Sequence, residues 1–148
     1  MQIFIDADGC PVVHITVNTA KQYSLPCTVI CDSAHIFNLD VVRVITVDKG
    51  ADSADFALVN LCGLGDVVVT QDYGLAAMCL AKGARAINQN GLIYSDSNIS
   101  QLLDSRYLSK KARRAGQRLK GPRKRTAEDD KAFLDSLLKL LSEGVDAR

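Results

Sequence analysis

Short apolar runs alternate with helix-like segments over the first two thirds of the chain. The runs are rich in β-branched residues and only a few residues long, which is typical of strands buried on both faces of a sheet. They predict strands at 3–5, 27–31, 41–47, 66–70 and 84–88, with a short edge strand at 91–94.

The segments between these runs have the length and punctuation of helices. We expect helices at 11–23, with Pro11 in its first position, at 52–62, ended by Gly63, and at 75–82, ended by Gly83. Strands that alternate with helices favour an α/β fold of three layers, with a mainly parallel sheet of about five strands.

The pattern changes after residue 97. Ile99, Leu102, Leu103 and Tyr107 recur at helical spacing, and Gly121-Pro122 interrupts this helix. Thr126 and Asp129 have the spacing of a capping box, which predicts a final helix with one apolar face. That face consists of Phe133, Leu134, Leu137, Leu138 and Leu141. We therefore expect one domain over 1–148, with an α/β core at 1–97 and a helical extension at 98–148.

Composition narrows the cellular setting. The start, MQIFIDADG, has no basic leader, and no apolar run is long enough to span a membrane. The five cysteines are an odd number and lie mostly in apolar runs, where free thiols pack as small hydrophobes. We therefore expect a cytoplasmic protein with no membrane partner.

Basic residues are concentrated in one segment. Residues 106–125 hold ten of the 18 Lys and Arg residues and none of the 17 acids. Such a segment binds a polyanion by releasing counterions, or it is simply a solvated helix face. The candidate nucleic-acid-binding residues are Lys110, Lys111, Arg113, Arg114, Arg118, Arg123, Lys124 and Arg125.

Carboxylates follow the predicted strands. Asp6 and Asp8 follow the first strand, Asp52 and Asp55 open the helix after the third, and Asp72 follows the fourth. Because ligands of parallel α/β sheets bind beyond the carboxyl ends of the strands, we expect these groups to converge. A divalent cation would offset their repulsion, and all-oxygen ligands suit Mg²⁺ or Mn²⁺.

Several of these acids also have ordinary structural interpretations. Asp52 could be a helix cap, Asp55 a first-turn acid and Asp72 a turn residue. Asp129 and Asp130 open the last helix, where they favour its dipole, although they could also reach the site as extra ligands. The two histidines, His14 and His35, have no triad partners in the sequence, and we interpret them as structural.

Four ordered motifs resemble a known family. They are IFIDADGCPV at 3–12, GADSAD at 50–55, TQDYGLA at 70–76 and GPRKRTAEDDKAF at 121–133. Together they resemble the YaiI/YqxD-type bacterial family, which looks PIN-like. That resemblance implies a Rossmann-type fold, and many PIN-like domains are metal-dependent ribonucleases. The PIN pattern of acids maps onto Asp6, Asp55 and Asp72, with Asp8 as a further candidate.

The residues and the resemblance together predict a nuclease that cleaves RNA phosphodiesters with Mg²⁺ or Mn²⁺. Its catalytic and metal-binding residues would be Asp6, Asp8, Asp55 and Asp72. RNA is expected over DNA only because of the PIN resemblance.

Two other function classes stay open. Asp6-Ala7-Asp8-Gly9 resembles the hhhDxDG motif of haloacid-dehalogenase-like phosphohydrolases, although their Lys and Ser/Thr positions have no clear match. A non-catalytic RNA-binding module is the third class. Cys10 lies in the loop beside the acids, and we expect it to be a packed thiol. A helix start at Pro11 would lower its pKa, which leaves a redox role as a minor alternative.

Overall fold

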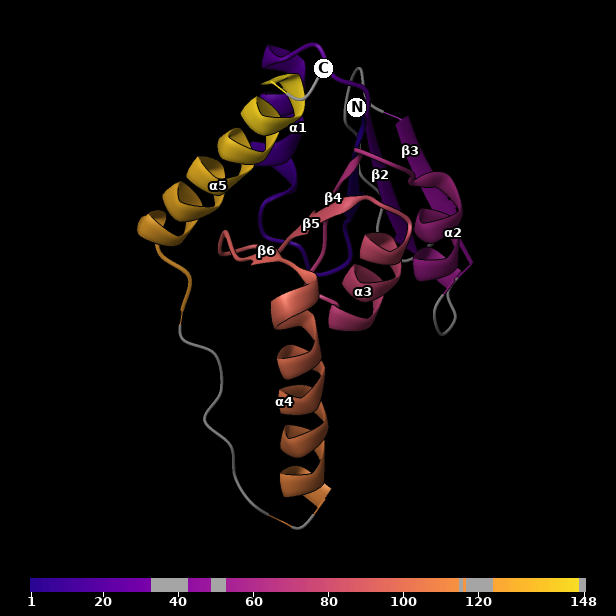
Figure 1. Ribbon diagram of the computed structural model, residues 1–148, viewed down its shortest axis with the longest axis vertical. Helices are drawn as coiled ribbons and strands as arrows, with labels where there is room; N and C mark the ends of the chain where they lie inside the picture. Colours follow the sequence, from indigo (N-terminus) through magenta and orange to yellow (C-terminus); the bar gives the residue numbers. More distant parts are fainter. Residues whose placement is uncertain (33–42, 49–52, 115, 117–123, 147–148) are drawn as a thin grey trace.

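A computed structural model describes residues 1–32, 43–48, 53–114, 116 and 124–146 (Figure 1). Its six strands are β1 (Ile3–Asp6), β2 (Cys27–Asp32), β3 (Arg43–Val47), β4 (Val67–Val69), β5 (Arg85–Ile87) and β6 (Ile93–Tyr94). The helices are α1 (Val13–Gln22), α2 (Ser53–Leu61), α3 (Tyr73–Ala81), α4 (Asp96–Arg114) and α5 (Ala127–Asp146).

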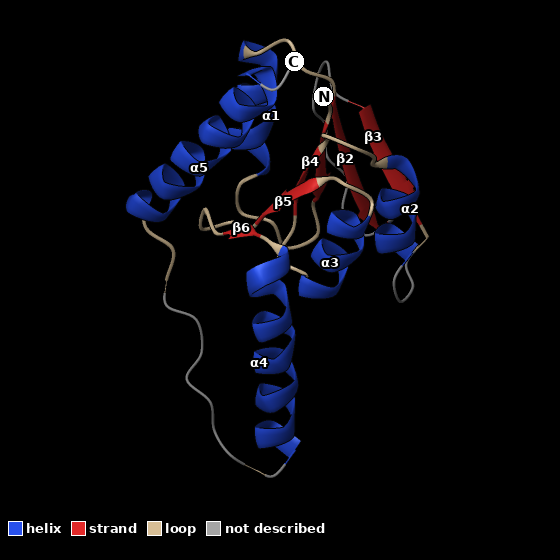
Figure 2. Ribbon diagram, in the orientation of Figure 1, coloured by secondary structure: helices blue, strands red, loops and turns tan. Residues whose placement is uncertain are grey.

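The strands form one sheet in the order β3-β2-β1-β4-β5-β6, in which only β5 and β6 pair antiparallel (Figure 2). The predicted α/β class with a mainly parallel sheet is therefore confirmed. The expected edge strand at 91–94 is β6, and it brings the sheet to six strands.

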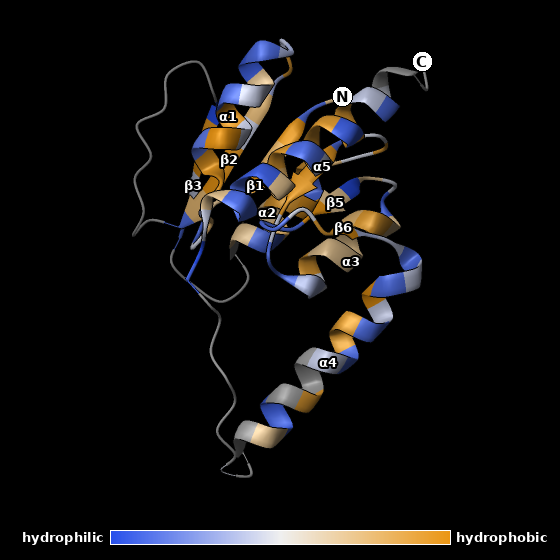
Figure 3. Cartoon of the chain, turned by 90° about the vertical axis from the view of Figure 1, so that its left-hand side faces the viewer, coloured by the Kyte–Doolittle hydropathy of each residue, from blue (hydrophilic) through white to orange (hydrophobic). Residues whose placement is uncertain are grey.

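Helices cover both faces of the sheet, so the core has two halves. Alternate residues of β1 point to opposite faces: Ile3 and Ile5 pack with α1 and α5, whereas Phe4 packs with α2, α3 and the start of α4. The sheet between these layers is the most apolar part of the molecule (Figure 3). Burial of this surface at about 25 cal/mol per Å² is the main force that holds the layers together.

The last helix belongs to this core. Phe133, Leu137 and Leu141 are fully buried against the face of the sheet that carries Ile3 and Ile5, as their apolar spacing predicted. Leu140 is also buried there, although the spacing of apolar residues did not indicate it. By contrast, α4 starts against α3 and then extends away from the sheet (Figures 1 and 3).

One local expectation was wrong. Helix α1 begins at Val13, so Pro11 precedes the helix instead of occupying its first position. Within α1, Thr16 and Thr19 donate their hydroxyl protons to the carbonyls of Val12 and Ile15, which satisfies these β-branched residues inside a helix. Among the helices of the described residues, none is long and apolar enough to cross a membrane.

The sheet has a topological switch point between β1 and β4. From β1, the chain proceeds through α1 to β2 and β3 on one side, and then crosses through α2 to β4 on the other. The connections that leave the carboxyl ends of β1 and β4 therefore diverge to opposite faces, which opens a crevice between them.

Candidate functional site

Asp6 lies at the carboxyl end of β1, at the switch point. Burial raises the pKa of its carboxyl group, and the nearby charges of Asp72 and Asp8 raise it further. The hydroxyl of Thr70 acts in the opposite direction, because it donates a hydrogen bond of 2.8 Å to Asp6 Oδ2. The fold thus concentrates negative charge around a partly buried acid.

Thr70 connects Asp6 to Asp72 across the switch point. Its Oγ1 accepts the Asp72 backbone N–H at 3.0 Å, so its only proton is directed to Asp6. Thr70 itself is buried, and its carbonyl accepts the Tyr94 hydroxyl at 3.1 Å. This buried residue therefore fixes the orientation of the Asp6 carboxylate.

Asp72 is the N-cap of α3. Its Oδ1 accepts the backbone N–H groups of Gly74 at 2.8 Å and Leu75 at 3.2 Å. Its structural role is therefore that of a helix N-cap, and not that of the turn residue expected as the alternative. The cap also holds the carboxylate at the start of the helix, near Asp6 and its negative charge.

Asp8 lies in the loop after β1 and is held by the neighbouring strand. The backbone N–H of Asp32, at the end of β2, donates to both Asp8 oxygens at 3.1 and 3.3 Å. This contact draws Asp8 toward the β2 side of β1, while Asp72 approaches from the β4 side. Asp6 lies between them, as the carboxyl ends of three adjacent strands require.

Of the other predicted site acids, Asp55 lies in the first turn of α2. Burial is the main cause that raises the pKa of the Cys79 thiol in α3, and the charge of Asp55 contributes least. Asp52 lies outside the described residues. Asp129 and Asp130 are engaged at the start of α5, where Asp129 closes the capping box and Asp130 pairs with Arg125.

The carboxylates do not form a closed metal cage. Within the described ranges, no three His, Cys, Asp or Glu side chains are grouped so that they could hold a metal ion. Mg²⁺, however, usually keeps several waters and takes only one or two carboxylates together with substrate phosphates. An all-oxygen cluster with residual repulsion at Asp6 fits such an open site.

A polar pocket of about 410 Å³ adjoins the acids. Its walls are Gly9, Pro11, Gln71, Gln89, Asn90, Arg125 and Asp129. Gly9 directly follows Asp8, and Gln71 lies between Thr70 and Asp72. Gln71 Nε2 donates to the Gly9 carbonyl at 2.8 Å, so the two loops that carry the acids are tied together at the pocket edge.

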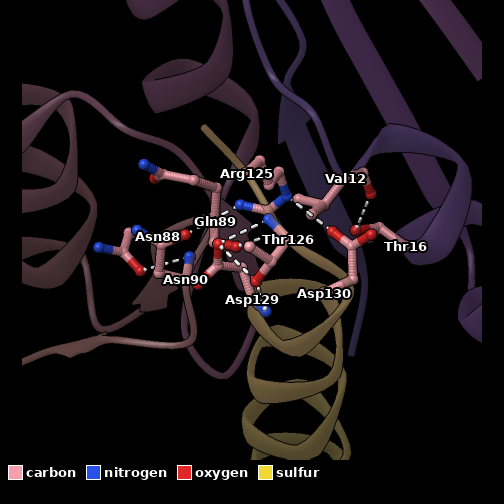
Figure 4. Close-up of polar contacts among 9 residues, drawn as sticks. All are labelled: Val12, Thr16, Asn88, Gln89, Asn90, Arg125, Thr126, Asp129 and Asp130. Carbon is pink, nitrogen blue, oxygen red and sulfur yellow. Dashed lines mark hydrogen bonds and ion pairs between the residues drawn. The ribbon is translucent and has the colours of Figure 1, made fainter. Parts of the chain in front are cut away.

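Arg125 forms the other side of this pocket and is engaged in tertiary contacts through all three of its nitrogens (Figure 4). It donates from Nε to Asp130 at 2.7 Å, from Nη1 to Asn90 Oδ1 at 2.9 Å and from Nη2 to the Gln89 carbonyl at 2.7 Å. Arg125 therefore has a structural role, because it fastens the start of α5 to the β5–β6 turn. Its predicted role in nucleic-acid binding stays a prediction.

The remaining predicted basic residues divide into two groups. Lys110 and Lys111 on α4 and Lys124 before α5 are exposed. Arg113 and Arg114 lie on the last turn of α4, with side chains outside the described part of the structure, and Arg118 and Arg123 lie in segments that are not described.

Cys10 lies between the acids and Arg125. Burial raises the pKa of its thiol, Asp6 raises it further, and the Val12 backbone and Arg125 lower it. The Val12 backbone, at the N-cap of α1, has the effect that a helix start was expected to have on the pKa, but burial outweighs it. The environment favours the packed thiol over the redox role.

Sequence reasoning missed several residues of this region. Thr70, Gln89 and Asn90 are uncharged and carried no site signal, although Thr70 lies inside the TQDYGLA motif. Asp66 is buried and accepts the backbone N–H groups of Gln2 and Gly63, both at 3.0 Å.

Comparisons with known proteins agree with the four motifs. The family model described as uncharacterized BCR, YaiI/YqxD family, matches residues 4–143. A UPF0178 protein of Clostridium acetobutylicum is 50% identical over 97% of this chain and 99% of its own length. One from Ruminiclostridium cellulolyticum is 54% identical over 93% of this chain and 90% of its own. No solved structure matches the chain.

Proposed function

This chain belongs to the YaiI/YqxD family, and from its site we propose that it is a divalent-metal-dependent nuclease that hydrolyses RNA phosphodiesters. The reaction joins a water oxygen to phosphorus and breaks one P–O ester bond. The observation that carries the proposal is the link from Asp6 through Thr70 to Asp72 across the switch point, with Asp8 alongside.

The position of this link supports a ligand site. Open α/β sheets bind ligands at the switch point, beyond the carboxyl ends of the strands. The charges of Asp72 and Asp8 add to the rise in the pKa of Asp6 that burial causes, and a bound dication would offset both effects.

Asp6, with Asp8 or Asp72, would hold the cation. Once bound, such an ion supplies a water of lowered pKa and positive charge next to the reacting phosphate. The residues of the chain do the positioning: Thr70 fixes the Asp6 carboxylate, the start of α3 fixes Asp72, and the Asp32 N–H fixes Asp8. Fixed, partly buried groups stabilise a charged transition state without reorganising.

Two observations support RNA as the substrate. The exposed Lys110 and Lys111 on α4, and Lys124 before α5, provide positive charge for a phosphate backbone. The resemblance to PIN-like domains, many of which cleave RNA, favours RNA over DNA. The remaining 128 residues carry more acids than bases, so attraction to RNA depends on this segment.

The test compares Asp6→Asn with Asp135→Asn, an exposed acid on α5 that serves as the matched control. With Mn²⁺, the wild type should cleave labelled single-stranded RNA, and Asp6→Asn should lower the rate by at least about 100-fold, the scale for loss of a catalytic electrostatic group. Mn²⁺ should also raise the melting temperature of the wild type and of Asp135→Asn, but not of Asp6→Asn.

Cleavage that persists in Asp6→Asn or in EDTA would refute the proposal. Beryllium fluoride bound to the Asp6 carboxylate, where it mimics an acyl phosphate, would instead support the haloacid-dehalogenase-like alternative. RNA binding without turnover, in a protein whose melting temperature does not respond to Mn²⁺, would indicate a non-catalytic module.

A further inference from the structure

We infer that the pocket beside the carboxylates is a subsite for one unpaired nucleobase of the substrate strand, and that Gln89 reads its hydrogen-bonding edge. The inference rests on the proposed function, which it deepens. The pocket shares Gly9 and Gln71 with the two loops that carry the acids, so a nucleotide seated in it lies next to the reacting phosphate.

The size and lining of the pocket fit a base. About 410 Å³ is within the range of small-molecule sites, and is enough for a single nucleoside. Three of its lining residues, Gln71, Gln89 and Asn90, carry side-chain amides, and Gln71 Nε2 and Asn90 Oδ1 each already make one hydrogen bond. Amides present a donor and an acceptor side by side, which is the arrangement that pairs with a base edge.

Gln89 provides the specific signal. Its Oε1 is buried and has no hydrogen-bond partner in the part of the chain that the structure describes. An unsatisfied buried acceptor is unfavourable, and native proteins rarely keep one without a reason. Because this oxygen is shielded from solvent in the free protein, the amide has to turn toward the pocket, where an exocyclic amino group of a base would satisfy it.

The charge balance disfavours a phosphate in this pocket. Arg125 is the one basic residue among its described lining residues, and it is already paired with Asp130 at 2.7 Å. Asp129, which also lines the pocket, adds a negative charge. The start of α5 is not open to an anion either, because Thr126 and Asp129 cap it reciprocally. A neutral ligand rich in hydrogen bonds fits these walls better than an anion.

The backbone of the β5–β6 turn and the Arg125 side chain are held in position before any ligand binds. Asn88 Oδ1 accepts the backbone N–H groups of Asn90 at 2.9 Å and Leu92 at 2.8 Å, which closes the β5–β6 turn. Arg125 then joins this turn to α5 (Figure 4). A preorganised pocket loses little entropy on binding, which suits selective recognition of a small group.

Binding of the four nucleoside 5′-monophosphates and of ribose 5-phosphate to the full chain, in EDTA, tests the inference by calorimetry. We expect at least one nucleotide to bind about tenfold more tightly than ribose 5-phosphate, and the four bases to differ by about fivefold or more. Gln89→Leu should weaken binding of the preferred nucleotide about tenfold and equalise the four. Gln22→Leu, an exposed glutamine at the end of α1, is the matched control and should change nothing.

Gln89→Glu provides a second variant should Gln89→Leu fail to fold. It keeps acceptors but loses the amide donor, so preference should shift toward guanine, whose edge presents adjacent N–H donors. The inference is overturned if ribose 5-phosphate binds as tightly as every nucleotide, or if neither Gln89 variant changes base preference. RNA cleavage without base discrimination would refute only the inference of a base subsite. Base discrimination without cleavage would refute only the proposed nuclease function.

Discussion

At the scale of single residues, the site is defined by how one acid is surrounded. Asp6 is partly buried, receives one hydroxyl hydrogen bond, and lies in the fields of Asp8 and Asp72. Burial dominates, so the net effect is a raised pKa. The native fold therefore binds a proton at Asp6 more readily than the unfolded chain does.

This shift sets the direction of a pH dependence. Above the raised pKa, the charged Asp6 destabilises the folded state; as pH falls toward 3.8, the ordinary pKa of an aspartate, protonation removes that penalty. Asp6→Asn should therefore melt at a higher temperature than the wild type at about pH 7 in EDTA, and the difference should shrink toward about pH 4. Calorimetric melting at several pH values measures this; a gap independent of pH would contradict the assignment.

Thr70 gives a second prediction at this scale. Thr70→Val keeps the buried shape but removes the hydroxyl that serves Asp6 and Asp72. Loss of that group leaves the Asp72 N–H unsatisfied, so we expect destabilisation of about 1–3 kcal/mol and at least about a tenfold loss of RNA cleavage. Thr70→Ser retains the hydroxyl and should keep most of both; equal losses in the two variants would argue against this role.

At the scale of elements, the contact between α5 and the β5–β6 turn is what builds the pocket. Arg125 fastens the two, and Gly91 permits their close approach. Gly91 has a φ of +91°, and a Cβ there would lie 2.6 Å from the carbonyl oxygen of Ala132 in α5. A side chain at this position would strain the backbone and would also clash with α5.

Gly91→Ala should therefore weaken this junction. Gly65→Ala is the matched control, since Gly65 has a similar φ of +82° but a Cβ added there would meet no atom within 4 Å. Both lose the favourable glycine conformation, at about 1 kcal/mol, and Gly91→Ala should lose more because of the clash. Chemical denaturation measures both free energies of unfolding; equal values would show that the clash is relieved without loss.

At the scale of the whole molecule, opposite charges are separated in space. The site acids Asp6, Asp8 and Asp72 lie at the carboxyl ends of the strands. The basic segment, residues 106–125, begins on the part of α4 that projects from the body (Figure 1). Lys110 and Lys111 are exposed there. We expect this projecting part of α4, here called the arm, to bind the phosphate backbone of the substrate away from the acidic site. Binding there offsets the repulsion between the backbone and the acids.

Charge reversal on α4 tests the arm. Lys110→Glu with Lys111→Glu should weaken RNA binding and lower the slope of log affinity against log salt by about 0.7 for each phosphate that the two lysines no longer neutralise. Lys21→Glu with Lys139→Glu changes the net charge equally at exposed positions on α1 and α5. Fluorescence anisotropy at several salt concentrations separates the pairs; equal effects would mean that net charge, and not the arm, governs binding.

Patterns that act over a few residues were legible in the sequence. Apolar runs placed the strands, and the central strands show no alternation because they are buried on both faces. The run at 41–47 was also expected to be buried, but β3 lies at the edge of the sheet and is only partly buried. The Thr126–Asp129 box marked the start of α5 because capping involves neighbours only. The α/β class followed from these elements. The start of α1 was misplaced because Pro11 is compatible with a helix start but does not impose one.

The tertiary structure decided which distant groups meet. Thr70 and Asp6 are 64 residues apart, and Arg125 and Gln89 are 36 apart, so strand order and helix docking alone bring them into hydrogen-bonding distance. The same order brings the charges of Asp8 and Asp72 near Asp6. Composition and periodicity report burial and local geometry, but a site depends on distances between segments, and those exist only once the sheet has formed.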